Sequence, residues 1–245
     1  MRSPKILFLS PYPFGKAPSQ RLKFEQYYTL FEKNGFELQT SSFIDESFWE
    51  IIYKPGFFLQ KIAGTVRGYL RRIIDLCRLR QFDIVYIHLW VTPLGPPIFE
   101  WLVKILAKKI VYDIDDMIYL NNTQKRFIDR IKGRNKPIAL MRCADAVIVC
   151  SPFLEKFVLQ YNPAVTTILA SYNTAATTPK THATKATTTI GWTGTHSTLK
   201  YLSIVAPALK ELSRLRNIEF LVICNAPYFC DGVTVRNISW TAQNE

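Results

Sequence analysis

Three carboxylates follow one predicted strand, and they are the side chains best suited to chemistry. An apolar run over residues 108–112 predicts the strand, and Asp113, Asp115 and Asp116 come directly after it. Carboxylates this close repel one another unless a metal, a cation or open solvent compensates them. Three interpretations stay open: a D-x-D metal site for a diphosphate, a site that binds hydroxyl groups and removes a proton, or N-caps for a helix over residues 117–121.

A histidine lies near the end of the neighbouring predicted strand, residues 82–90 (FDIVYIHLW). His88 either faces a ligand cleft or is a hydrogen-bonded structural histidine. No G-x-S-x-G sequence occurs, so no Ser/His/Asp nucleophile set is indicated. In open α/β sheets, ligands bind beyond the carboxyl ends of the strands. The residues expected at those ends are Phe14, Gly15, His88, residues 93–97, Asp113, Asp115, Asp116, Ser151 and Gly194.

A glycine turn late in the sequence is the other candidate site. Residues 189–202 (TIGWTGTHSTLKYL) predict a short strand, a tight turn and a helix that Ser197 or Thr198 caps. Gly194 permits a ligand to approach the backbone closely, and a helix start offers N–H donors to a phosphate. The spacing is neither G-x-G-x-x-G nor a Walker loop, so an ordinary strand-to-helix turn is the alternative.

Strands and helices alternate along the chain, which indicates an α/β protein with a doubly wound parallel sheet. Residues 1–173 are predicted to form an N-terminal Rossmann-like domain. Residues 174–189 are half threonine and hold no bulky apolar side chain, so we predict a linker there. Residues 190–245 predict the start of a second, incomplete Rossmann-like domain. Predicted strands of the first domain cover residues 5–10, 36–44, 82–90, 108–112, 144–150 and 167–170, and a helix is predicted from residue 19 to 34.

The overall charge indicates anionic partners. The 245 residues carry a formal net charge of +12, which favours binding to nucleotides, sugar phosphates, anionic lipid or nucleic acid. The five cysteines are scattered and form no C-x-x-C pair, so neither a zinc site nor a disulfide framework is indicated, and a reducing cytoplasm is expected. No run of eighteen apolar residues occurs, so no membrane span is predicted.

Residues 54–80 combine apolar residues at helical spacing with many cations. A basic amphipathic helix with aromatic residues can lie on an anionic membrane surface. The alternative is a helix that packs on the sheet and turns a basic face to solvent. The residues expected to contact a membrane or an acceptor are Lys61, Arg67, Arg71, Arg72 and Arg78.

Several stretches together resemble family 4 (group 1) glycosyltransferases of the GT-B fold. They are KILFLSPYPFG with the helix after it, FDIVYIHLW with the GPP loop, KKIVYDIDDMIY, ADAVIVCSPFLEKF and IGWTGTHSTLKYL. They occur in the order of that family and span nearly the whole chain. The last stretch carries most of the resemblance.

The resemblance implies two Rossmann-like domains and a nucleotide-sugar donor held mainly by the second. It implies retention at the anomeric carbon without an obligatory metal or cofactor, which argues against the D-x-D metal site. Phe14 and Gly15 match the loop that approaches the donor, and Gly194, Thr195 and Ser197 match the loop near its diphosphate. Asp113 to Asp116 stand where many members carry a histidine. The basic pair and E-x7-E element of the family are missing from this sequence, so we expect this chain alone to be inactive.

The expected function is transfer of a hexose from a UDP- or GDP-linked donor to a glycan or lipid-linked acceptor in cell-envelope polysaccharide synthesis. Asp113, Asp115, Asp116 and His88 are the predicted catalytic residues, without a metal. The expected location is cytoplasmic and peripheral at the membrane. The alternative is a basic, non-catalytic α/β module that binds nucleic acid or an anionic membrane, although no nucleic-acid-binding signature occurs.

Overall fold

The structure is a computed structural model that describes residues 2–116, 133, 135–169, 171, 172, 174, 178 and 186–241. The chain divides into two compact units, Met1–Ala176 and Thr177–Glu245. Each unit has its own sheet and its own apolar core, and each is described by itself.

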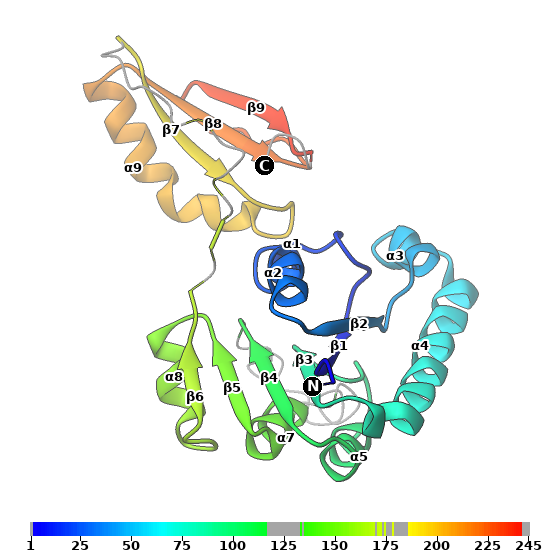
Figure 1. The fold of residues 1–245 in the computed structure, drawn as a ribbon. Coiled ribbons are helices and arrows are strands. Elements are labelled where there is room, and N and C mark those ends of the chain that lie inside the picture. Colours follow the sequence, from blue (N-terminus) through cyan, green and yellow to red (C-terminus); the bar gives the residue numbers. More distant parts are fainter. Residues whose placement is uncertain are drawn as a thin grey trace. The chain divides into compact units, whose positions relative to one another are not determined.

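The first unit is built on a six-stranded sheet in the order β2-β1-β3-β4-β5-β6, and every neighbouring pair is parallel (Figure 1). This confirms the predicted parallel α/β fold. The last strand of this sheet, β6, ends at residue 167. It therefore lies earlier in the chain than the strand predicted over residues 167–170. The strands are β1 (Lys5–Ser10), β2 (Glu37–Ser42), β3 (Ile84–His88), β4 (Ile110–Ile114), β5 (Ala146–Val149) and β6 (Val165–Thr167).

The strands are apolar on both faces because helical segments cover both. On β1, Leu7 and Leu9 belong to the core that includes residues of α5, α7 and α8, whereas Ile6 and Phe8 pack with Phe24 on the opposite face. The helix predicted from residue 19 to 34 is instead three short pieces. The helical segments are α1 (Pro18–Arg21), η1 (Glu25–Tyr27), α2 (Tyr28–Lys33), α3 (Glu46–Ile52), α4 (Phe58–Arg78), η2 (Leu79–Gln81), α5 (Ile98–Leu106), α7 (Lys136–Cys143) and α8 (Pro152–Val158).

The strand order reverses between β1 and β3. From β1 the chain crosses to β2 on one side and then returns to place β3 on the other side. In doubly wound sheets this reversal leaves a crevice beyond the carboxyl ends of the two strands, where ligands bind. Here those ends are Ser10 and His88, with Asp113 of β4 beside His88. The topology therefore places the candidate site at this edge.

Helix α4 packs on its neighbours through a stripe of small and charged residues. The buried positions are Gly64, Gly68, Arg72 and Asp75, and the apolar residues of the helix lie on the exposed side. A Cβ atom at Gly64 would stand 2.5 Å from Phe48 Cγ, and one at Gly68 would stand 2.6 Å from Phe43 Cε1. Because glycine has no Cβ atom, the rings of Phe48 and Phe43 pack directly against the backbone of the helix. The helix contacts the sheet, as the alternative to a membrane helix expects, but most of its large apolar side chains are turned outward.

Adding a methyl group at either glycine is expected to destabilise the protein. Gly64→Ala and Gly68→Ala should each lower the free energy of unfolding by about 1–3 kcal/mol, because the new Cβ overlaps a phenylalanine ring. In an exposed helix the same change would be stabilising by about 1 kcal/mol. Urea denaturation measures the difference. Ala63→Leu on the exposed side of α4 is the control, and glycine variants as stable as that control would contradict the packing described.

The second unit holds a parallel three-stranded sheet in the order β7-β8-β9. Its strands are β7 (Thr188–Thr193), β8 (Ile218–Cys224) and β9 (Val235–Ser239), with η4 (Leu199–Tyr201) and α9 (Leu202–Leu215) between the first two. Leu202 and Leu209 of α9 pack on Phe220 and Val222 of β8. Most of the predicted linker, residues 174–189, lies outside the described residues.

Within the described ranges, no helix has the length and apolar character needed to cross a membrane. All five cysteines are free thiols.

Candidate functional site

His88 and Asp113 form a buried pair at the carboxyl edge of the first sheet. They are direct neighbours in the register of β3 and β4, and His88 Nδ1 lies 3.2 Å from Asp113 Oδ2. The Tyr86 hydroxyl donates to the same carboxylate oxygen at 2.8 Å, and Lys23 forms an ion pair with the other oxygen. The structure thus brings together two residues that the sequence singled out separately.

The carboxylate of Asp113 is fully occupied. Burial raises its pKa, but the hydrogen bond and charge of His88 and the charge of Lys23 outweigh this, and the net effect lowers the pKa of Asp113 below its usual value. The side chain is completely buried and receives three donors. Direct binding of a sugar hydroxyl by Asp113 stays a prediction. Its contacts make it a positioning residue for His88.

The pairing fixes the proton arrangement of His88. Because an ionised carboxylate only accepts hydrogen bonds, Nδ1 carries a proton in both forms of His88. Nε2 is an acceptor in the neutral form and a donor in the charged form. In the described part of the chain, Nε2 is buried and has no hydrogen-bond partner. The ring of Phe24 packs edge-on against the His88 imidazole, with 5.3 Å between the two ring centroids. A buried acceptor without a partner is costly, and a ligand hydroxyl placed there would satisfy it.

The other two acids differ from Asp113 and from each other. Asp115 is half-buried, and burial, together with the charges of Asp116 and Asp113, raises its pKa despite the opposing charges of His88 and Lys23. One of its oxygens, Oδ1, is buried without a partner among the described residues, whereas Asp116 is exposed. The alternative role as caps concerns residues 117–121, which lie outside the described residues. No cluster of metal-ligating side chains occurs within the described ranges.

The loop after β1 contains Phe14 and Gly15. Gly15 adopts φ = 74°, and its N–H donates to Glu25 Oε2 at 2.9 Å. Gln20 braces the loop by donating to Glu25 Oε1 at 2.9 Å and to the Tyr12 carbonyl at 3.0 Å. Since this N–H is already used beside a carboxylate, Gly15 shapes the loop and offers no free donor to a phosphate. Phe14 is 59% exposed and stacks one face on Tyr28.

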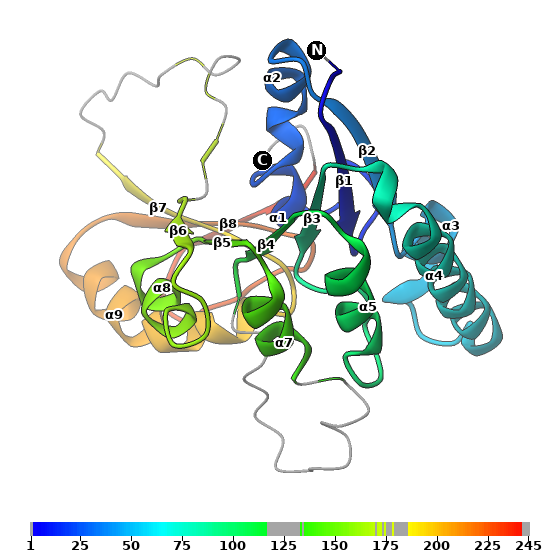
Figure 2. The same ribbon diagram turned by 60° about the horizontal axis from the view of Figure 1, so that its bottom comes forward.

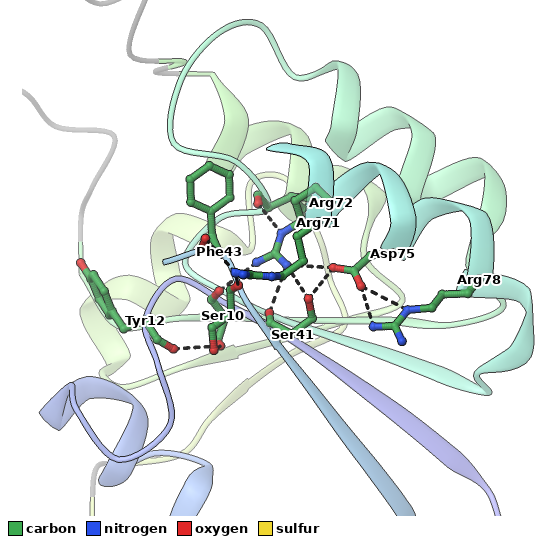
Figure 3. Close-up of polar contacts among 10 residues, drawn as sticks. Ser10, Tyr12, Ser41, Phe43, Arg71, Arg72, Asp75 and Arg78 are labelled. Carbon is green, nitrogen blue, oxygen red and sulfur yellow. Dashed lines mark hydrogen bonds and ion pairs between the residues drawn. The ribbon is translucent and has the colours of Figure 1, made fainter. Parts of the chain in front are cut away.

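Arg72 ties together the strand ends that frame the site (Figure 3). Its guanidinium donates to the carbonyl oxygens of Ser10 at 2.8 Å, Ser41 at 3.0 Å and Val91 at 2.8 Å. It also pairs with Asp75 at 3.0 Å. Burial lowers the pKa of Arg72 to about 10, against the opposing effect of Asp75. The group connects the end of β1, β2 and the loop after β3.

This role corrects the sequence prediction for Arg72. The residue was expected among the cations that contact a membrane or an acceptor, but it is completely buried. The signal in the sequence is the spacing of Gly64, Gly68, Arg72 and Asp75, which share one face of a helix. Lys23, Gln20 and Glu25, which support the site, also escaped sequence reasoning because they lie in a segment that predicts only a plain helix.

The remaining predicted membrane contacts lie along the flanks of α4. Arg67 and Arg71 stand 3.5 Å and 3.6 Å from Asp45 Oδ2, and Arg78 stands 2.7 Å from Asp75 Oδ1. The Lys61 ammonium donates to the carbonyl of Lys54. These four side chains keep partial exposure, so contact with an external surface stays a prediction for them.

In the glycine turn of the second unit, side chains of the turn itself pack beside Gly194 and hydrogen-bond to one another. A Cβ at Gly194 would stand 2.5 Å from the Trp192 ring, so the close approach made there is to an indole ring. Thr195 N donates to Thr198 Oγ1 at 3.2 Å, and the hydroxyls of Thr195 and Ser197 lie 2.8 Å apart. Thr198 precedes the 3-10 helix η4, which leads directly into α9, but its side chain makes no capping hydrogen bond, and Ser197 lies one residue further upstream. Binding of a diphosphate by this turn stays a prediction.

Comparisons with known proteins give two similar structures among those found. The glycosyltransferase SnogD from Streptomyces nogalater is 13% identical, with 97% of this chain and 72% of that chain covered and a TM-score of 0.46. The spinosyn rhamnosyltransferase SpnG, complexed with spinosyn aglycone, is 11% identical, with 97% and 70% covered and a TM-score of 0.43. At these values neither likeness carries an argument about this chain. No protein-family model and no curated protein matches the sequence.

Proposed function

We propose that this protein transfers a hexose from a UDP- or GDP-linked donor to a hydroxyl group of a glycan or lipid-linked acceptor, as part of cell-envelope polysaccharide synthesis. The observation that carries the proposal is the His88–Asp113 pair at the reversal of strand order, with the Nε2 acceptor unpartnered in the described part of the chain. In this proposal the first unit receives the acceptor, and the second unit takes part in binding the donor.

The proposed role of His88 is to accept the proton of the attacking hydroxyl. Asp113 stabilises the imidazolium that forms, and Lys23 and Tyr86 keep the carboxylate ionised and in place. Because His88 is completely buried and the Phe24 ring lies against it, the acceptor reaches Nε2 only after the Phe24 side chain moves. The exposed ring of Phe14 offers a stacking surface for a sugar, and Asp115 Oδ1 offers a hydrogen-bond acceptor.

The donor side of the proposal rests on the family resemblance. Thr195, Ser197 and the backbone at Gly194 are proposed to contact the diphosphate. The bond between the anomeric carbon and the diphosphate breaks, the acceptor oxygen bonds to that carbon on the same face, and the nucleoside diphosphate leaves, so the anomeric configuration is retained. Retention is read from the product by proton NMR of the new glycosidic bond. An inverted product would leave hexose transfer in place and overturn the retaining part of the proposal.

Transfer is expected to proceed without a divalent ion. The full gene product is incubated with a panel of UDP- and GDP-linked hexoses and with membranes of the producing cell as a source of acceptor, and release of the nucleoside diphosphate is measured. At least one donor should be consumed, and EDTA should change the rate by less than about twofold, because the family resemblance implies transfer without an obligatory metal. Loss of release with EDTA and its return with manganese would contradict a metal-free site. Failure of every donor would contradict the proposed function.

A further inference from the structure

The outer face of helix α4 is apolar, which is unusual for a helix beside a sheet. Its buried stripe consists of glycine, arginine and aspartate, so the amphipathic pattern is turned outward. Six bulky side chains on this face are each 46–76% exposed. They are Leu59, Ile62, Val66, Leu70, Ile73 and Ile74.

Helix α5 extends the same surface. It packs against α4, and the two helices lie side by side in both ribbon views (Figure 2). Ile98, Trp101, Leu102 and Ile105 of α5 are 37–72% exposed. Between the helices runs an open, apolar groove of about 700 Å³ with Arg80 at its rim. We call the exposed apolar residues of α4 and α5 the α4–α5 surface. Contiguous exposed apolar surface of this kind marks a site of contact with a partner or a membrane.

The charges on α4, α5 and the segments that join them are mostly positive, although the adjoining helix α3 adds the exposed acids Glu46 and Glu50, and Asp45 before it pairs with Arg67 and Arg71. Residues 54–109 include ten lysines and arginines but only three acids, Asp75, Asp83 and Glu100. Asp75 and Glu100 are buried, and Asp83 is paired with Lys108 at 2.8 Å. Among the described residues, Lys54, Lys61, Arg80 and Lys104 belong to no ion pair with an acid. An apolar face bordered by free cations is complementary to an anionic lipid bilayer.

We propose that the α4–α5 surface docks on an anionic lipid bilayer, with α4 lying in the plane of the headgroups. The helix is about 30 Å long, and its outward side chains form one apolar layer that fits the depth to which interfacial helices insert. A second copy of the chain fits poorly, because pairing this surface with itself brings the same cations face to face. The inference goes beyond hexose transfer and does not depend on it.

The membrane test uses sedimentation with vesicles, and it needs neither donor nor acceptor. The protein should sediment with vesicles of phosphatidylglycerol and phosphatidylcholine in equal amounts, and far less with phosphatidylcholine alone. Leu59→Gln combined with Val66→Gln should weaken binding roughly tenfold or more, because two inserted side chains are lost. Lys61→Gln and Arg80→Gln should each weaken it about fivefold. Ile204→Gln in α9, which removes an equally exposed apolar side chain outside the surface, should leave binding unchanged.

Three results would overturn the inference. They are absence of sedimentation with the anionic vesicles, equal binding to both kinds of vesicle, and unchanged binding of the Leu59→Gln, Val66→Gln variant. Size-exclusion chromatography with light scattering can give a fourth result that would overturn the inference. If the wild-type protein is a dimer that this double variant converts to a monomer, the surface is occupied by a second copy instead. Circular dichroism melting curves that match the wild type show that the variants are folded, as expected for exposed positions.

Discussion

Replacing Arg72 with methionine is expected to lower the free energy of unfolding by about 3–5 kcal/mol. The change leaves the buried Asp75 carboxylate without its closest buried cation, although Arg78 still reaches it. It also removes the donors to the carbonyl groups of Ser10, Ser41 and Val91, which belong to three different segments of the chain. Each of these carbonyl oxygens that is left buried without a donor lowers the free energy of unfolding further. The edge of the sheet that carries the candidate site should loosen together with the fold.

Urea denaturation measures this effect, with the midpoint and the slope compared between variants. Arg67→Met is the matched control, because Arg67 lies on the same helix and is about half exposed, so the change should cost less than about 0.5 kcal/mol. Removing both buried charges in Arg72→Met, Asp75→Leu should recover part of the loss, since no lone charge remains buried. An Arg72→Met protein as stable as Arg67→Met would contradict the described network.

Replacing His88 with glutamine is expected to lower kcat for hexose transfer by roughly 10²–10⁴-fold. Glutamine is polar and can hydrogen-bond to Asp113, but it cannot take up a proton in the transition state. Because the proposed role concerns the transition state and not the binding of the donor, KM for the nucleotide sugar should change little. Steady-state kinetics with the full gene product separate the two constants.

Tyr86→Phe is the matched control for His88→Gln. It removes one hydrogen bond to the same Asp113 carboxylate and leaves the pair with His88 intact, so kcat should fall by less than about tenfold. Asp113→Asn should resemble His88→Gln, since a neutral amide neither fixes nor stabilises the imidazolium. If Tyr86→Phe lowered kcat as much as His88→Gln, the histidine would have only a structural role.

The architecture of the first unit could largely be predicted from the sequence. Continuous apolar runs such as residues 82–90 and 144–150 are typical of strands buried on both faces, and a parallel sheet has that property. The orientation of α4 could not be predicted. The helical periodicity shows that residues 58–78 have an apolar face and a mixed face, but not which of them is buried. That choice depends on Phe43, Phe48 and the carbonyl groups of distant segments.

Individual residues of the candidate site could be predicted from the sequence, but the contacts between them could not. His88 and Asp113 could be singled out because each stands at the end of a strand. Their pairing depends on the register of β3 with β4, which no local pattern encodes. The third partner, Lys23, comes from the segment between α1 and η1. The helical segment of the second unit begins at Leu199 as the 3-10 helix η4 and becomes the α-helix α9 at Leu202, while the Thr198 hydroxyl hydrogen-bonds within the turn before it.

The most direct test of a sugar-transfer site at His88 is the incorporation of radiolabelled hexose from its nucleotide donor into membrane acceptor. The wild-type gene product and the His88→Gln variant are compared at equal amounts of folded protein. Labelled product is expected with the wild type, and at least about a hundredfold less of it with the variant. Equal incorporation by the two proteins would contradict a sugar-transfer site at His88.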